Sequence, residues 1–226
     1  SRSFSVELEA GKILKVEAKR FLSLVDDEVG AIQYSITPLE FSGTAKIKPY
    51  LDFDVTNADA NWDDKFWEPV SQEVSDASGV VQSRTKKTGF EAAVAMQYVW
   101  TENNKKISVS AKAEEKESYV ASAFESKIKE GHTYTLYKYA GVVSSLNYEA
   151  SKLSQKAKDA AVRVTKKGFK KMLQEHEVAW ATKWETSDIR IEGDVASQQG
   201  IRFNIFHLNQ TFTGVDERLN IGPKGF

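Results

Sequence analysis

Three aromatic side chains beside two acids form the segment whose composition best suits carbohydrate chemistry. Trp62, Phe66 and Trp67 lie within one short segment, and Asp63 and Asp64 stand between them. Aromatic rings stack on sugar faces, and carboxylates accept hydrogen bonds from sugar hydroxyl groups. Aromatic side chains also dominate buried contacts between domains and subunits. The segment therefore predicts either a sugar-binding surface or a contact with another domain or subunit.

The remaining titratable side chains do not have the spacing of a metal site. His132, His176 and His207 are scattered, no pair is four residues apart on a helix, and the chain contains no cysteine. The acids of Asp26-Asp27-Glu28 lie in a predicted turn, where side chains face solvent. We therefore expect no metal site and no cofactor.

The elements that would position these residues change character along the chain. Residues 1–145 contain short segments of alternating hydrophobicity separated by Gly, Ser, Asn and Asp, which is typical of an antiparallel β-sandwich. The first two segments flank Ala10-Gly11 and predict a hairpin. The predicted strands are residues 5–9, 13–18, 29–36, 45–55, 90–100, 107–113 and 134–143.

Residues 146–186 have helical periodicity instead. Leu153, Ala157, Ala160/Ala161 and Val164 recur at helical spacing, and a second stripe runs from Phe169 to Trp180 and Trp184. Because a glycine inside a helix costs about 1 kcal/mol, Gly168 predicts a break between two helices.

A third helix is predicted to begin near Asp194, a good N-cap. Its apolar residues lie on two faces, Ile201/Ile205/Leu208/Phe212 and Phe203/Phe206, so we expect this helix to be buried between two layers. We also expect Trp180 and Trp184 of the preceding helix to be buried.

Composition narrows the class of protein. A net charge of -1 provides no general attraction for nucleic acid or an anionic membrane. No apolar run approaches the roughly 18 residues of a membrane span, and no signal peptide is evident. The lack of cysteine fits a reducing compartment, so we expect a cytoplasmic location. The first residues alternate like the interior of a strand and begin without Met, which predicts an internal piece of a larger protein.

Several segments resemble glycoside hydrolase family 65 phosphorylases, and the last 45 or so residues are the most specific part, whereas residues 70–165 match weakly. The matching segments are Arg2-Ser3-Phe4, Arg20-Phe21-Leu22-Ser23, Phe66-Trp67-Glu68, Trp180 with Trp184, Ile191-Glu192-Gly193-Asp194, Gln198 to Phe206, and Asp216 to Phe226.

The resemblance implies a mainly β fold followed by helices. Residues 1–145 would be the later part of an N-terminal antiparallel β-sandwich, 146–186 a helical linker, and 187–226 the beginning of an (α/α)6 catalytic barrel, including its first helix. It also implies cleavage of an α-linked glucose disaccharide by inorganic phosphate as co-substrate, with inversion to β-glucose 1-phosphate and glucose. In that reaction a carboxylic acid protonates the departing oxygen while phosphate attacks the opposite face. Maltose is the first candidate substrate, followed by trehalose and kojibiose.

The family's catalytic acid and phosphate-binding segment have no counterpart in this chain, so the resemblance implies no catalytic residue here. It favours a domain or subunit contact for Trp62, Phe66 and Trp67, and it implies a homodimer. It places the loop with Gly222, Lys224, Gly225 and Phe226 after the first barrel helix, on the substrate side, where glycines permit close backbone approach.

Two other functions fit the sequence. One is a carbohydrate-binding β-sandwich without catalytic activity, and the other is a hydrolase of the same fold that uses water instead of phosphate. The segments that would separate the hydrolase from the phosphorylase are not in this chain.

Overall fold

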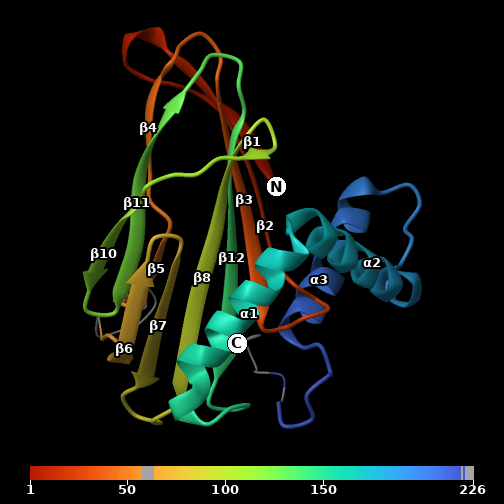
Figure 1. Cartoon of the computed structure of the whole chain (residues 1–226). Helices are drawn as coiled ribbons and strands as arrows, with labels where there is room; N and C mark the ends of the chain where they lie inside the picture. Colours follow the sequence, from red (N-terminus) through yellow and green to blue (C-terminus); the bar gives the residue numbers. More distant parts are fainter. Residues whose placement is uncertain (57–63, 220, 222–226) are drawn as a thin grey trace. The chain divides into compact units, whose positions relative to one another are not determined.

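The alternating segments of the first half form two antiparallel sheets. A computed structural model describes residues 1–56, 64–219 and 221, and the chain divides into two compact units, Ser1–Glu175 and His176–Phe226. The larger sheet has the strand order β1-β2-β3-β12-β8-β7-β6, with β9 paired to β8, and the smaller has the order β10-β11-β4, with β5 paired to β11 (Figure 1). The strands are β1 Arg2–Glu7, β2 Ile13–Leu22, β3 Val29–Pro38, β4 Gly43–Ile47, β5 Tyr50–Asp52, β6 Trp67–Ser75, β7 Ser78–Thr85, β8 Glu91–Glu102, β9 Lys105–Lys106, β10 Lys112–Lys116, β11 Tyr119–Ile128 and β12 Tyr134–Ser144.

The predicted hairpin is confirmed. Strands β1 and β2 pair in antiparallel register, and a short 3₁₀ turn, Glu9–Gly11, joins them. Both Ala10 and Gly11 have positive φ angles, 62° and 70°. Glycine adopts this backbone conformation without a steric penalty, which explains its position in the turn.

Other strand predictions are wrong in detail. The expected strand over 45–55 is divided into β4 and β5 by Lys48-Pro49, and most of 107–113 lies outside a strand. Strands β6, β7, β9 and β11 lie outside all of the predicted ranges. In β7 five consecutive residues, 79–83, are buried, because the strand is covered on both faces. Such a strand lacks the alternation that reveals a half-exposed one.

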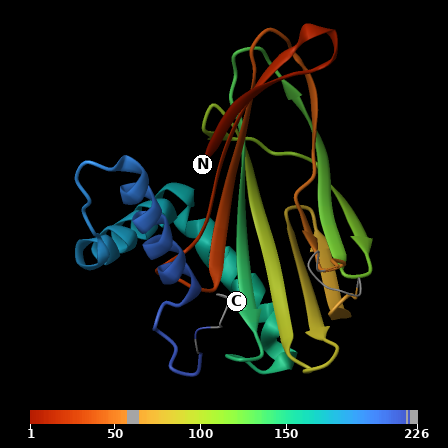
Figure 2. The same cartoon turned by 180° about the vertical axis from the view of Figure 1, so that it is seen from behind.

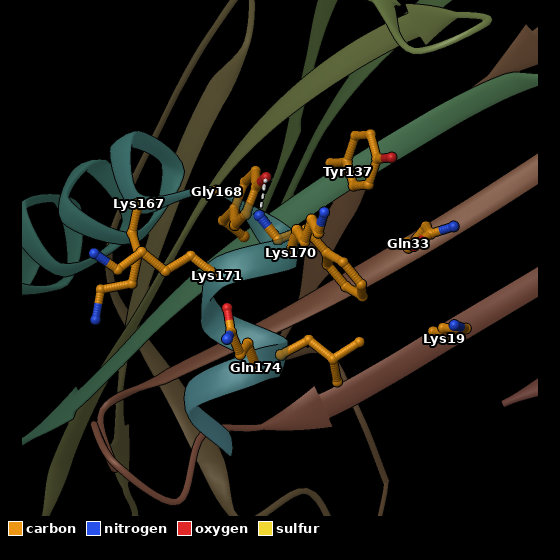
Figure 3. Close-up of a pocket in the computed structure, with 11 residues that line it drawn as sticks. Lys19, Gln33, Tyr137, Lys167, Gly168, Lys170, Lys171 and Gln174 are labelled. Carbon is orange, nitrogen blue, oxygen red and sulfur yellow. Dashed lines mark hydrogen bonds between the residues drawn. The ribbon is translucent and has the colours of Figure 1, made fainter. Parts of the chain in front are cut away.

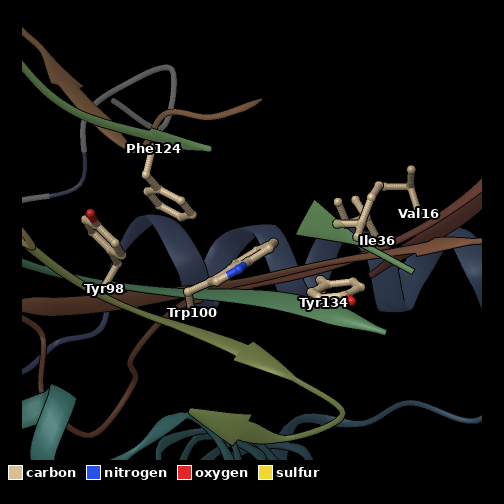
Figure 4. Packing of buried hydrophobic residues seen from close by; sticks show 7 residues of the cluster. Val16, Ile36, Tyr98, Trp100, Phe124 and Tyr134 are labelled. Atoms are coloured by element: carbon tan, nitrogen blue, oxygen red, sulfur yellow. The ribbon is translucent and has the colours of Figure 1, made fainter. Parts of the chain in front are cut away.

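Large aromatic side chains fill the space between the two sheets (Figure 4). The Trp100 ring lies edge-on to Phe124 of the small sheet, at 5.6 Å between centroids, and stacks on Tyr134 at 6.0 Å. The indole N–H of Trp100 donates to Ser126 Oγ at 3.1 Å, and the Tyr98 hydroxyl lies 2.7 Å from Ser122 Oγ. The polar atoms of these buried rings are therefore paired across the sandwich, as burial requires.

Helix α1, Leu153–Lys167, covers the opposite face of the large sheet (Figures 1 and 2). The predicted stripe is confirmed, because Leu153, Ala157, Ala160, Ala161 and Val164 are all buried. Leu153, Ala157 and Ala161 pack on short side chains of β7, β8 and β12, including Ala93, Ala95 and Val143. Ala160 and Val164 pack in a second cluster with Val29, Ala31 and Tyr139. The first unit thus has three layers: small sheet, large sheet and helix.

The predicted break at Gly168 is also confirmed. This residue has φ 83° and ψ 153°, which ends α1, and α2, Phe169–Ser187, begins at the next residue. Phe169 and Met172 are the two buried residues of α2 and join a cluster with Val29, Ala31 and Tyr139 of the large sheet.

The second unit contains the rest of α2 and helix α3, Val195–Thr211. Asp194 caps α3 as predicted, because its Oδ1 accepts the backbone N–H groups of Ala196 and Ser197. In this chain α3 has no buried residue, and Trp180 and Trp184 are only half-buried. Their burial between two layers in a longer protein stays a prediction. Trp180 packs against Phe206 at 5.0 Å, whereas Phe203 remains 61% exposed. Within this unit α3 has a covering layer on one side at most.

The fold class, antiparallel sheets followed by helices, is as predicted. The division at 145 and 186 and the assignment of 187–226 to a barrel stay predictions.

Candidate functional site

The first predicted site lies at an edge of the large sheet. Trp62 falls outside the residues that the structure describes. Phe66 precedes β6 and is 39% exposed, and Trp67 is the first residue of β6, which is an edge strand of the large sheet. The Trp67 ring meets Phe53 edge-on at 5.3 Å, so these two rings face each other.

Phe66 lines a small cleft of about 250 Å³. Its other lining residues are Asp64, Lys65, Thr85, Lys86, Lys87 and Thr88. Lys65 pairs with Asp54, and this hydrogen bond raises the pKa of Lys65 above its usual range. The structure therefore places Phe66 beside one of the two predicted acids, Asp64, and three lysines. Whether this corner contacts sugar or protein stays a prediction.

The predicted substrate-side loop cannot be located. Gly222, Lys224, Gly225 and Phe226 all fall outside the described residues. Its role also stays a prediction.

The acidic turn after β2 is a turn as predicted, but two of its acids do not simply face solvent. Asp26 pairs with Arg163 of α1, with Nη2 at 2.8 Å from Oδ2, and Glu28 accepts a hydrogen bond from the Tyr148 hydroxyl at 2.9 Å. These contacts tie the β2–β3 turn to α1 and to the segment before it, which gives both acids a structural role.

A histidine, a glutamate and a tyrosine meet where β8 and β12 pair. Glu102 Oε1 lies 2.8 Å from His132 Nδ1 and accepts the Tyr134 hydroxyl at 2.7 Å. The Tyr134 hydrogen bond, followed by that of His132, lowers the pKa of Glu102. A carboxylate held ionised in this way is a poor proton donor, so it does not suit the role of a glycosidic acid. Among the described residues no group of three or more His, Cys, Asp or Glu side chains could hold a metal ion.

A larger cleft, which the sequence analysis missed, lies where α1 meets α2 (Figure 3). Its volume is about 690 Å³, and we call it the junction cleft. Its lining residues are Lys19, Gln33, Tyr137, Tyr139, Lys167, Gly168, Phe169, Lys170, Lys171, Leu173 and Gln174.

Strand register explains how the floor of the junction cleft arises. Lys19 of β2 is the partner of Gln33 in β3, and Gln33 is the partner of Tyr137 in β12. Residues paired in register lie side by side on the same face of a sheet. The three side chains therefore form one row across three strands, although they are far apart in sequence.

The rim of the junction cleft comes from the break between the helices. Gly168 turns the chain, and the first turn of α2 carries Lys170 and Lys171 above the sheet (Figure 3). The Tyr139 hydroxyl accepts the Phe169 backbone N–H at 3.0 Å, and the Phe169 ring packs against Tyr137 at 5.6 Å. Burial raises the pKa of Tyr139. The neutral hydroxyl thus fixes the start of α2 over the strands.

One local signal of this site is present in the sequence, the two lysine pairs Lys166-Lys167 and Lys170-Lys171. Lysines on a helix that are followed closely by glutamates, such as Glu175 and Glu177, are more typical of a solvated face than of a binding site. In the structure three of the four, Lys167, Lys170 and Lys171, line the cleft on either side of the turn at Gly168. The strand residues gave no signal, because their pairing is a long-range property.

Comparisons with known proteins agree on one family. The model of the N-terminal domain of glycosyl hydrolase family 65 matches residues 1–183. The chain is 33% identical to the maltose phosphorylase of Bacillus subtilis over 95% of its own length and 28% of the relative's. It is 32% identical to the α,α-trehalose phosphorylase of Thermoanaerobacter brockii, over 99% of its length and 30% of the relative's.

The fold has a close structural counterpart. A solved structure described as a putative kojibiose phosphorylase from human microbiome superposes with a TM-score of 0.86 at 21% identity, covering 99% of this chain and 28% of the other. The chain thus spans about three tenths of the length of the relatives that it matches. No helix among the described residues is long and apolar enough to cross a membrane.

Proposed function

Because the chain belongs to glycoside hydrolase family 65, we propose that it is the non-catalytic N-terminal part of a disaccharide phosphorylase. The observation that carries the proposal is the match of the family's N-terminal domain to residues 1–183. Identities of 33% and 32% to two phosphorylases, across almost the whole chain, support it further.

The proposed reaction cleaves an α-linked glucose disaccharide with inorganic phosphate. A carboxylic acid outside this chain protonates the departing oxygen, phosphate attacks the anomeric carbon from the opposite face, and inversion yields β-glucose 1-phosphate and glucose. Maltose is the substrate that we propose first, since the maltose phosphorylase has 33% identity. The trehalose phosphorylase has 32% and a kojibiose phosphorylase 25%, so trehalose and kojibiose follow.

We propose that the chain itself acts as scaffold and contact surface. The three-layered first unit has buried apolar clusters on both faces of the large sheet, and the second unit carries exposed apolar side chains on α3, including Phe203 and Leu208. Exposed apolar side chains of this size are typical of surfaces that another domain covers. We also propose that the parent enzyme is a cytoplasmic homodimer.

The activity is tested by comparing this chain with a longer one that includes the catalytic domain. Maltose, trehalose and kojibiose are each incubated with and without phosphate, and products are followed by proton NMR, which distinguishes the two anomers of glucose 1-phosphate. We expect phosphate-dependent turnover of about 1–100 per second with one disaccharide in the longer protein, and none in the 226-residue chain. Glucose release without phosphate would instead identify a hydrolase.

A second experiment tests the proposed contact role of Phe66, which precedes β6. Phe66→Ala in the longer protein should weaken association between domains or subunits and leave the KM for disaccharide unchanged. Lys87→Ala, in the same cleft, is the matched control. A rise in KM with unchanged assembly would show that Phe66 contacts sugar instead.

A further inference from the structure

The junction cleft has an unusual balance of charge. Four of its lining residues are lysines, and no carboxylate lines it. Lys167 is neutralised by Glu175, 2.7 Å away. Lys19, Lys170 and Lys171 have no ion pair among the residues that the structure describes. Uncompensated cations gathered in one concave site attract an anion, because the low-dielectric walls concentrate their field.

The rest of the lining suits a ring that carries hydroxyl groups. Tyr137 supplies aromatic surface, and Gln33 and Gln174 supply amide groups that donate and accept hydrogen bonds. Gln33 and Tyr137 are half-buried, so part of each side chain remains accessible from the cleft. Sugars bind to protein through this combination of ring faces and side-chain amides.

The walls are rigid, so the site exists before any ligand arrives. Its floor is a row of paired residues on β2, β3 and β12, and its rim is fixed by the hydrogen bond from Phe169 N–H to Tyr139. Tyr139 is only 4% exposed. A site on strands and a fixed helix start loses little conformational entropy when it binds a ligand.

The dimensions favour a small molecule over a protein surface. A volume of about 690 Å³ lies within the range of roughly 300–1,000 Å³ of small-molecule sites. An acidic protein face would meet the exposed lysines, but it would leave the aromatic floor without a partner.

We propose that the junction cleft binds a phosphorylated sugar. Its phosphoryl oxygens accept hydrogen bonds from Lys19 and Lys170, and its hydroxyl groups bond to Gln33 and Gln174. The ring lies against Tyr137. This proposal goes beyond the proposed function and does not depend on it.

Titration calorimetry on the 226-residue chain tests the proposal with four probes: glucose 1-phosphate, glucose 6-phosphate, inorganic phosphate and glucose. We expect one of the sugar phosphates to bind with a dissociation constant in about the 0.1–1 mM range. Inorganic phosphate and glucose should each bind at least about tenfold more weakly, because each makes only part of the contacts.

Matched variants locate the site. Lys19→Gln and Lys170→Gln should each weaken sugar phosphate binding about five- to tenfold, since each removes one charge-assisted hydrogen bond. Tyr137→Ala should weaken sugar phosphate binding more than phosphate binding. Lys166→Gln is the control, because Lys166 is exposed at the same end of α1 but does not line the cleft. Circular dichroism confirms that each variant is folded.

Three results would overturn the proposal. The first is that neither sugar phosphate binds at about 10 mM, well above the expected dissociation constant. The second is an equal loss of binding in Lys166→Gln, which would indicate diffuse surface charge. The third is that inorganic phosphate binds as tightly as the sugar phosphates, which would reduce the site to an anion site. If no probe binds, acetylation of the cleft lysines identifies the occupant. Lysines that react in the 226-residue chain and are protected in a longer chain with its catalytic domain would show that the occupant is protein.

Discussion

Replacing Gly141 with alanine should separate α1 from the large sheet. A Cβ at this position in β12 would meet Ala157 O, Ala160 Cβ and Ala161 N of α1, the last two at 2.8 and 2.9 Å. All three distances are below 3.0 Å, and two of the atoms belong to the α1 backbone, which cannot rotate away as a side chain can. The helix must therefore shift as a unit.

The magnitude follows from two opposing terms. Overpacking a dense core costs typically about 1–3 kcal/mol and occasionally more, and backbone atoms place this site at the upper end. A strand alanine recovers roughly 0.5–1 kcal/mol because glycine has more conformational freedom in the unfolded chain. We expect a net loss of about 2–3 kcal/mol. With an m value of about 2–3 kcal/mol/M, the urea midpoint should fall by roughly 1 M.

Gly43→Ala is the matched control in the same unit. Its Cβ would meet only the Phe41 ring, at 3.8 and 3.9 Å, which is ordinary van der Waals contact. Urea unfolding followed by circular dichroism should give this variant a midpoint at or slightly above the parent value. Equal urea midpoints for Gly141→Ala and Gly43→Ala would show that the backbone of α1 does not approach β12 this closely.

Three other predictions depend on how deeply parts of the chain are buried. Trp180→Ala should destabilise the second unit by about 1–3 kcal/mol, because Trp180 is half-buried and a fully buried tryptophan contributes roughly 3–5 kcal/mol. An unchanged urea midpoint would show that the contact of Trp180 with Phe206 does not stabilise the unit. Backbone amides of α3 should exchange with solvent much faster than those of α1 in the 226-residue chain, and slow exchange across α3 in a proven monomer would contradict this. Burial lowers the pKa of Lys138 to about 8. The unfolded chain then binds more protons from about pH 8 to 10.5, so stability should rise with pH between about 8 and 9.5, by no more than about 2 kcal/mol, and the rise should vanish in Lys138→Met.

Local periodicity and single-residue conformation were readable without the structure. The β1–β2 hairpin, the buried stripe of α1, the break at Gly168 and the Asp194 cap all depend on residues within a few positions of one another. Each of these features is set by backbone geometry or by one short-range hydrogen bond. A short stretch of sequence is therefore enough to predict each of them.

The cleft and the missed strands depended on tertiary structure. The row of Lys19, Gln33 and Tyr137 exists only because β12 inserts between β3 and β8, and that register is set by packing of the core. Strand β7 is buried on both faces, so its sequence shows no alternation. The two apolar faces of α3 were visible in its sequence, but the partners that would cover them were not, because no local pattern specifies which distant segment packs on a helix. Pairing between distant segments is decided by the whole core, and this is why the chain's family was visible in its sequence while the junction cleft was not.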